Sequence, residues 1–152
     1  EDKHGEARDV FETMLDQEET RVLGLRGLYL EAQTSEDGLT ARQYADKAHE
    51  LAPKMAWAGK AEQDFASSAG EWQAALETLA SNKANRLVSK EDANRQRAVL
   101  LTANAMSIEL SDPKIARKQA LEATKLAPTL VPAAATASRV MVRLGEVRQA
   151  SK

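Results

Sequence analysis

Histidine side chains are the first candidates for chemistry in this chain, and there are only two of them, His4 and His49. A zinc hydrolase usually places two histidines on one helix face with a glutamate between them, as in His-x-x-Glu-His. His4 and His49 lie far apart in the sequence, and neither is part of such an arrangement. We therefore expect solvated helix positions for both, and no metal or catalytic role.

Gly24 and Gly27 are the glycines with the closest spacing, as a phosphate-binding loop would need. Such a loop follows a β-strand, whereas these two glycines lie inside a run of helix-forming residues. The better explanation for both is close contact with a neighbouring helix. The carboxylates are numerous but scattered, and no pair of them is placed for acid–base catalysis. The sequence predicts a protein that is not an enzyme and needs no cofactor.

Composition is ordinary for a soluble globular domain, with 43% hydrophobic and 29% charged residues among 152 and a net charge of −2. The absence of cysteine excludes disulfides, thiolate metal sites and a cysteine nucleophile. No apolar run reaches the length of a membrane span, and no signal peptide is visible. Because the chain starts at Glu1 and stops at Lys152 within a repeating pattern, we expect a fragment whose membrane or targeting segments lie elsewhere.

One stretch occurs twice and points to the elements that position the side chains. Residues 41–53 read ARQYADKAHELAP and residues 116–128 read ARKQALEATKLAP, with seven of thirteen positions identical. The shared alanines step by four and then three, so they lie on one face of a helix. The proline after each copy ends that helix. A stripe of small residues favours a helix held closely between its neighbours.

Helix-forming residues dominate the rest of the chain, and no segment alternates like a β-strand. We expect Thr20 to cap the second helix, Ser89 and Asp92 to form a capping box, and Pro113 to begin a helix. Turns are expected at Gly70-Glu71-Trp72 and at Gly145-Glu146-Val147. The predicted helices, about nine in all, cover residues 5–15, 20–34, 39–52, 55–69, 71–82, 90–110, 113–127 and 130–144, and a last one follows residue 145.

If each proline closes a two-helix unit, units start at residues 22, 56, 97 and 131, with spacings of 34, 41 and 34. A helix hairpin of 34 residues with alanines at these places and a closing proline resembles the tetratricopeptide repeat. Tyr29 departs from the pattern, because the family has a small residue there. The resemblance implies one domain over residues 1–152, with a half-unit 1–20, units 22–53, 56–96 and 97–128, and a truncated unit 131–152.

A closer resemblance is to the HemY family of proteobacterial proteins, which is linked to late haem biosynthesis. It is carried by the strings ETRVLGLRGLYLEA (19–32), YADKAHELAPKMAWAG (44–59), AGEWQAALETL (69–79), RAVLLTANA (97–105) and KLAPTLVPAAATASRV (125–140). The resemblance implies that these repeats are the C-terminal part of a protein with an N-terminal anchor in the inner membrane. We expect them on the cytoplasmic side, where porphyrin enzymes work. The family has no established catalytic residues to transfer.

Direct binding of haem is the alternative function. Haem iron usually takes His, Cys, Met or Tyr as an axial ligand. His49, Tyr29 and Tyr44 are the candidates, but no Cys-Pro or Cys-x-x-Cys-His motif is present. A haem or porphyrin carrier would use the concave side of the repeats as its pocket.

Binding of a protein partner is the function that the repeats favour. In a stack of helix pairs, the first helices line the concave face, and their side chains outside the packing stripe point into a groove. Arginine and tryptophan there suit a binding surface. The predicted groove residues are Arg26, Leu30, Gln33, Trp57, Lys60, Asp64, Leu101, Ile108, Arg139 and Arg143.

Charge is uneven along the chain. Residues 1–20 hold eight acidic and two basic side chains, and residues 83–118 hold eight basic and four acidic ones. The basic group suits an acidic partner or an anionic lipid surface, although a solvated helix face is the default explanation. Two copies could also pair the acidic end of one with the basic middle of the other. The basic side chains are Lys83, Arg86, Lys90, Arg95, Arg97, Lys114, Arg117 and Lys118.

These observations together predict an all-α protein, a right-handed α–α superhelix (solenoid) of tetratricopeptide-type helix hairpins. Its predicted function is a protein-binding scaffold, with enzymes of the haem pathway as candidate partners and no nucleic acid among them. Self-association of the fragment is a further possibility, because the end helices lack their neighbours.

Overall fold

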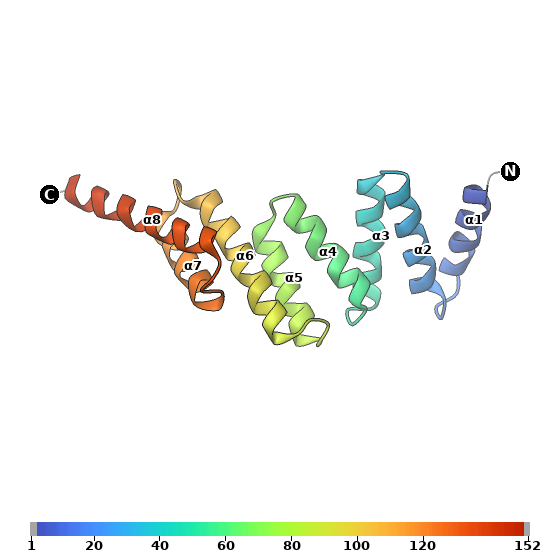
Figure 1. Ribbon diagram of the computed structural model, residues 1–152. Coiled ribbons are helices and arrows are strands. Elements are labelled where there is room, and N and C mark those ends of the chain that lie inside the picture. The colour runs from blue at the N-terminus through green and yellow to red at the C-terminus, as the bar shows by residue number, and fades with distance from the viewer. Residues whose placement is uncertain (1–2, 151–152) are drawn as a thin grey trace. The chain divides into compact units, whose positions relative to one another are not determined.

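The computed structural model describes residues 3–150, and the side chains of residues 5–145. This part of the chain is all-helical, as predicted, and holds eight helices and no strand (Figure 1). They are α1 (Lys3–Leu15), α2 (Arg21–Thr34), α3 (Gly38–Leu51), α4 (Ala56–Ser68), α5 (Trp72–Ala84), α6 (Lys90–Ile108), α7 (Pro113–Leu126) and α8 (Val131–Ala150).

The chain divides into two compact units, Glu1–Phe65 and Ala66–Lys152, which we call unit 1 and unit 2. The boundary falls inside α4 and therefore inside the expected repeat 56–96. In unit 1, α2 packs between α1 and α3 (Figure 1). In unit 2, α6 packs against three helices, α5, α7 and α8.

The repeated alanine stripe is buried in both units. Ala41, Ala45 and Ala48 of α3 have no exposed surface, and neither do the matching alanines 116, 120 and 123 of α7. A methyl group is small enough to let the neighbouring helix approach closely over the whole stripe. The predicted reason for the repeat, a helix held tightly on one face, is therefore confirmed.

Gly24 and Gly27 show the same close approach between α1 and α2. A Cβ atom added at Gly24 would lie 2.7 Å from the backbone oxygen of Phe11, and one at Gly27 would lie 2.4 Å from the Phe11 ring. The prediction that helix contact explains both glycines is confirmed. Unit 1 is completed by a core of Leu25, Ala48 and Ala58.

Unit 2 has two buried clusters. The first joins α5 and α6 through Leu76, Leu79, Leu100 and Leu101, with Ala133 of α8 at its edge. The second joins α6, α7 and α8 and includes the buried residues Ala105, Ala116, Ala120, Ala137 and Val140. Because α6 contributes to both clusters and packs against α5, α7 and α8, it is the central helix of unit 2.

Helix starts follow the predicted chemistry at two of three positions. Pro113 begins α7, and the preceding Asp112 accepts a hydrogen bond from the Ile115 N–H at 3.1 Å. Ser89 caps α6 by accepting from the Asp92 N–H at 3.0 Å. Thr20 is the N-cap residue of α2 as predicted, but its side chain makes no cap hydrogen bond, because its hydroxyl instead donates to the Met14 carbonyl at 2.9 Å and ties α2 back to α1.

Helix ends share one motif in α2, α4 and α5. Gly70 has φ of +73°, the N–H of Glu71 bonds to the Ala66 carbonyl, and the N–H of Gly70 bonds to Ser67. These two bonds define a Schellman cap. Glu36 (φ 57°) and Arg86 (φ 60°) occupy the same left-handed position after α2 and α5. The predicted turn at Gly70 is thus confirmed.

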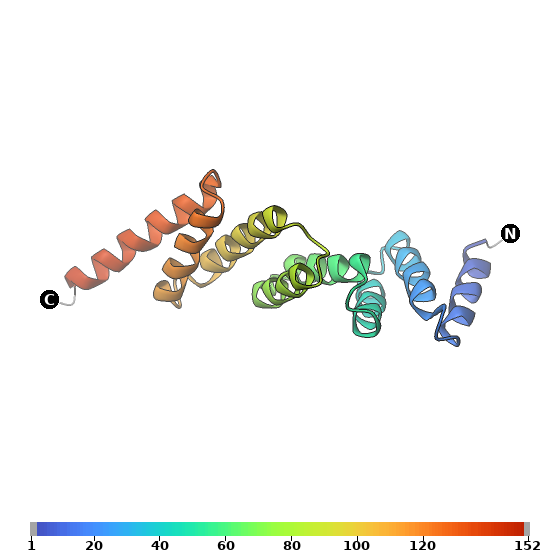
Figure 2. The same cartoon turned by 90° about the horizontal axis from the view of Figure 1, so that it is seen from below.

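The predicted turn at Gly145 is wrong. Helix α8 runs from Val131 to Ala150 without interruption (Figure 2), so the described residues hold eight helices instead of about nine. Glycine permits a left-handed turn but does not force one, and the residues around Gly145 are mostly good helix formers. A Cβ atom at Gly145 would meet nothing within 4 Å.

Candidate partner-binding surfaces

Unit 1 brings three aromatic side chains together between α2 and α4. The ring of Tyr29 lies 5.3 Å from that of Trp57 at an interplanar angle of 38°, and 6.4 Å from that of Phe65 in an edge-to-face contact at 89°. All three are half-buried. Such tilted and edge-to-face contacts are the favoured arrangements of aromatic rings. Tyr29, the departure from the repeat pattern, is therefore the centre of this cluster.

Six predicted groove residues lie on the two helices that carry these rings, and Trp57 is one of the rings. Arg26 and Gln33 share the face of α2 that carries Tyr29, since they lie three and four residues away from it. Leu30 is the next residue along the chain, and its exposed side chain lies on an adjoining face. On α4, Lys60 and Asp64 form an ion pair one turn apart, beside Trp57. We call the whole surface the aromatic face. It consists of Tyr29, Trp57 and Phe65 with Arg26, Leu30, Gln33, Lys60 and Asp64.

Charged and polar side chains of the aromatic face affect the ionisation of Tyr29. Burial raises the pKa of the Tyr29 hydroxyl above its ordinary value, and the negative charge of Asp64 raises it further. Lys60 and a hydrogen bond with the Gln33 side chain oppose this rise. The pKa of Lys60 is itself raised, because its ammonium group hydrogen-bonds with Asp64.

The three candidate haem ligands have separate surroundings in unit 1. The Nε2 of His49 lies 3.3 Å from Oε2 of Glu62, which joins α3 to α4. Tyr44 packs against the buried core of unit 1, and Tyr29 stacks on Trp57. Among the described residues, no group of three or more His, Cys, Asp or Glu side chains could hold a metal ion. The side chain of His4 lies outside the part that is described.

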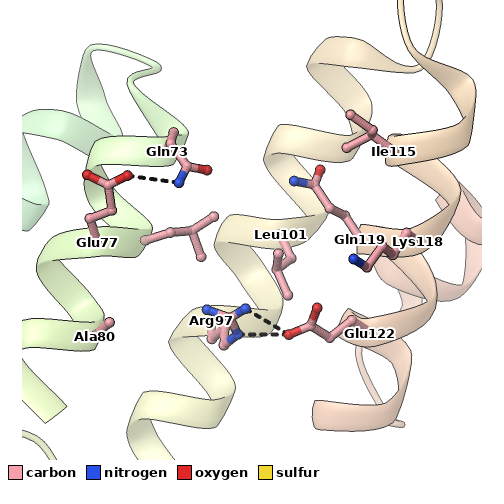
Figure 3. Close-up of a pocket in the computed structure, with 10 residues that line it drawn as sticks. Gln73, Glu77, Ala80, Arg97, Leu101, Ile115, Lys118, Gln119 and Glu122 are labelled. Atoms are coloured by element: carbon pink, nitrogen blue, oxygen red, sulfur yellow. Dashed lines mark hydrogen bonds and ion pairs between the residues drawn. The ribbon is translucent and has the colours of Figure 1, made fainter. Parts of the chain in front are cut away.

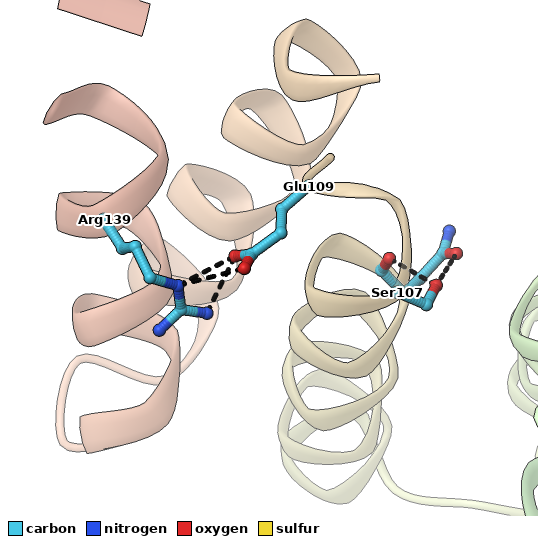
Figure 4. A network of polar contacts seen from close by, with 4 residues as sticks. Ser107, Glu109 and Arg139 are labelled. Atoms are coloured by element: carbon cyan, nitrogen blue, oxygen red, sulfur yellow. Dashed lines mark hydrogen bonds and ion pairs between the residues drawn. The ribbon is translucent and has the colours of Figure 1, made fainter. Parts of the chain in front are cut away.

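The four predicted groove residues of unit 2 differ in their burial and in their contacts. Leu101 is only 3% exposed, and Ile108 packs against the second buried cluster. Arg139 of α8 forms a bidentate ion pair with Glu109 at the end of α6, with Nε and Nη2 at 2.9 and 2.8 Å from Oε2 (Figure 4). Arg143 is half-buried on α8. Ile108 and Arg139 therefore help to hold α6 and α8 together.

The hollow of unit 2 lies elsewhere, between α5 and α7, where α6 forms its floor. Figure 3 shows side chains of α5 on one side, those of α7 on the other, and Leu101 and Arg97 between them. Its volume is about 400 Å³. A second hollow of about 500 Å³ continues along α5 and α6 and shares Ala80 and Arg97 with the first. We call the two together the trough.

Polar contacts fix the walls of the trough. The guanidinium of Arg97 binds Oε1 of Glu122 through Nε at 2.9 Å and Nη2 at 2.8 Å, which joins α6 to α7. On α5, the Gln73 amide donates to Glu77 at 2.9 Å. The Oε1 atom of Gln119 on α7 is buried and has no hydrogen-bond partner.

Sequence reasoning missed the trough because it searched first helices only. Four of the residues that line it come from α7, a second helix, and the pairing of Arg97 with Glu122 spans 25 positions. The available signal was the excess of basic residues between positions 83 and 118, three of which line the trough.

Comparison with known proteins found no matching family model, no matching curated protein and no matching solved structure. In the described part of the chain, none of the helices combines the length and the hydropathy that a membrane span requires.

Proposed function

We propose that this chain is a non-enzymatic scaffold that binds a protein partner through the aromatic face of unit 1. One observation carries the proposal. Six residues expected to face a partner come from the two helices that bring one cluster of half-buried rings together, and Trp57 is part of that cluster. Tryptophan, tyrosine and arginine are the residue types that contribute most to the binding energy at protein interfaces.

The aromatic face also supplies a polar rim of mixed charge. Arg26 is exposed and forms no ion pair among the described residues, so its guanidinium can accept a carboxylate of a partner in a bidentate contact. Lys60 and Asp64 are strongly exposed and lie on α4, the helix that also carries Trp57 and Phe65. An apolar centre with a polar rim is the common layout of a protein interface.

The finer architecture belongs to the same proposal. The helix hairpins form a right-handed α–α superhelix of tetratricopeptide type in which first helices line the concave side. The buried alanine stripes of α3 and α7 support this. Each stripe lies at the same place in its repeat, and each of the two helices ends just before a proline.

By its resemblance to the HemY family, the chain is proposed to be the repeat region of a protein anchored in the inner membrane, on the cytoplasmic side. The partner is then an enzyme of late haem or porphyrin biosynthesis. The five strings between residues 19 and 140 support this part of the proposal.

A pull-down from detergent-solubilised membranes of the source cell tests the proposal. The bait is this chain, beside a variant with Arg26→Ala and Lys60→Ala. A matched control carries Lys47→Ala and Lys54→Ala, which are also exposed residues of unit 1. We expect a haem-pathway enzyme to be retained by the wild-type and control baits and lost from the variant. Equal retention by all three baits contradicts the assignment of the aromatic face.

A further inference from the structure

We infer that the trough of unit 2 binds a short extended peptide in which acidic and apolar side chains alternate. This site is separate from the aromatic face and does not rest on the function proposed for it. The observations that carry it are the length of the trough, its apolar floor, its two lysines and the unpartnered amide oxygen of Gln119.

The length of the trough sets the size of the peptide. It follows α5 from Gln73 to Lys83, and ten residues at the helical rise of about 1.5 Å span roughly 15 Å. An extended chain advances about 3.3 Å per residue, so about five residues fill this length. The trough is open along one side, which suits a chain laid across the surface more than an enclosed small molecule.

The floor of the trough accepts apolar side chains. Leu76 and Leu101 belong to the buried core and present only their edges, and Ile115 adds an exposed side chain at one end. Further along, Leu79 and three alanines of α5 and α6 continue the apolar surface. Alternate side chains of an extended peptide point the same way, so every second residue of the peptide can lie on this floor.

The charge of the trough favours carboxylates on the peptide. Lys83 and Lys118 line its two parts, and neither forms an ion pair among the described residues. The charge of Arg97 is balanced by Glu122. Glu77 is the remaining acidic group of the wall and accepts a hydrogen bond from Gln73. The excess is therefore positive, but Glu77 disfavours a peptide that is acidic at every position.

Gln119 supplies a contact to the peptide backbone. Its buried Oε1 has no partner, and an unsatisfied buried acceptor is costly to leave unpaired. The Gln119 side chain lines the trough, so a rotation of its amide would bring this acceptor to a backbone N–H of a bound peptide. The trough is a hollow between α5 and α7, which a flat lipid surface does not enter, and this shape is the reason why we assign a peptide to it instead of a lipid surface.

Fluorescence anisotropy with a labelled, end-capped Asp-Leu-Glu-Leu-Asp peptide tests the inference at low ionic strength. We expect saturable binding that weakens as salt is added. Lys83→Gln and Lys118→Gln should each weaken binding about tenfold, the effect typical of one lost charge-assisted hydrogen bond. Gln119→Leu should weaken it several-fold. Lys114→Gln and Lys125→Gln, exposed lysines of α7 outside the trough, should leave it within twofold.

Three results overturn the inference: no saturable binding to the wild-type chain, equal binding of a Lys-Leu-Lys-Leu-Lys peptide, or equal losses in the trough and control variants. Analytical ultracentrifugation of the chain alone tests the other candidate occupant of the trough, a second copy of the chain. If the chain dimerises and the double variant at Lys83 and Lys118 is monomeric, a second copy fills the trough and the peptide assignment is wrong. Variants Arg26→Ala and Lys60→Ala should bind the peptide normally, which keeps this test apart from that of the aromatic face.

Discussion

Two glycines of α2 decide how closely α1 and α2 approach each other. The Phe11 carbonyl oxygen and the Phe11 ring occupy the space that a side chain at Gly24 or Gly27 would need. Of these obstacles, the backbone oxygen is the harder one to move, because the whole of α1 would have to shift. The sequence predicted the contact from the glycines alone, but not which residue of α1 makes it.

Gly24→Ala is expected to destabilise the protein by about 1–3 kcal/mol, the usual cost of overpacking a tight contact. The matched control is Gly145→Ala, where the added Cβ meets nothing within 4 Å. There the substitution should stabilise the protein by up to about 1 kcal/mol, because alanine is the better helix former. Urea denaturation of the two variants measures both effects, and a stabilising Gly24→Ala would contradict the close packing of α1 on α2.

Tyr29 provides a prediction about pH. Its pKa is raised in the folded protein, first by burial and then by Asp64, above the ordinary value of 10.0. The folded state therefore disfavours the phenolate. The stability that this provides is fully present below pH 10 and is lost as the pH rises through the pKa of the folded state.

A spectrophotometric titration at 295 nm checks this prediction. In the folded protein, one tyrosine should ionise at a pH above the ordinary pKa of the phenol, and Tyr29→Phe should remove this late component of the titration. If Tyr29→Phe leaves the late component unchanged, the burial of Tyr29 against Trp57 and Phe65 is wrong.

At the scale of the helices, the sequence predicted some helix ends correctly and others not. Asp112 and Ser89 cap their helices because a side-chain oxygen followed by free backbone N–H groups makes a local, short-range bond. Thr20 has the same local pattern, but the Met14 carbonyl competes for its hydroxyl through the packing of α1 on α2. Gly145 has the local sequence of a turn, yet α8 continues through it. Both misses arise because local chemistry permits more than one outcome.

Arg86→Gly is expected to stabilise unit 2. Arg86 occupies the left-handed position of the cap after α5, with φ of 60°, where a residue with a Cβ atom costs about 1 kcal/mol and glycine does not. Part of this gain is offset by the greater freedom of glycine in the unfolded chain. Thermal denaturation should show a melting temperature at or above that of the wild-type chain. Arg95→Gly, in the interior of α6, is the control and should lower it by several degrees.

At the scale of the whole molecule, the repeat pattern predicted a chain of helices and the places where they end. The residues that it selected on α2 and α4 lie on the two helices that carry the Tyr29–Trp57 ring contact, and their role toward a partner stays a prediction. The repeat pattern selected poorly on α6, because that helix packs against α5, α7 and α8 at once. Burial on several sides depends on contacts between distant residues, which a repeat period does not contain.

The emission of Trp57 is the most direct measure of the central claim. In a Trp72→Phe background, Trp57 is the sole tryptophan of the chain, so its fluorescence reports the aromatic face alone. When the enzyme retained in the pull-down is added, we predict a saturable change in this emission, and we predict that Arg26→Ala with Lys60→Ala abolishes it. Binding of that enzyme at unchanged affinity to the double variant, with no change in Trp57 emission, would contradict the account.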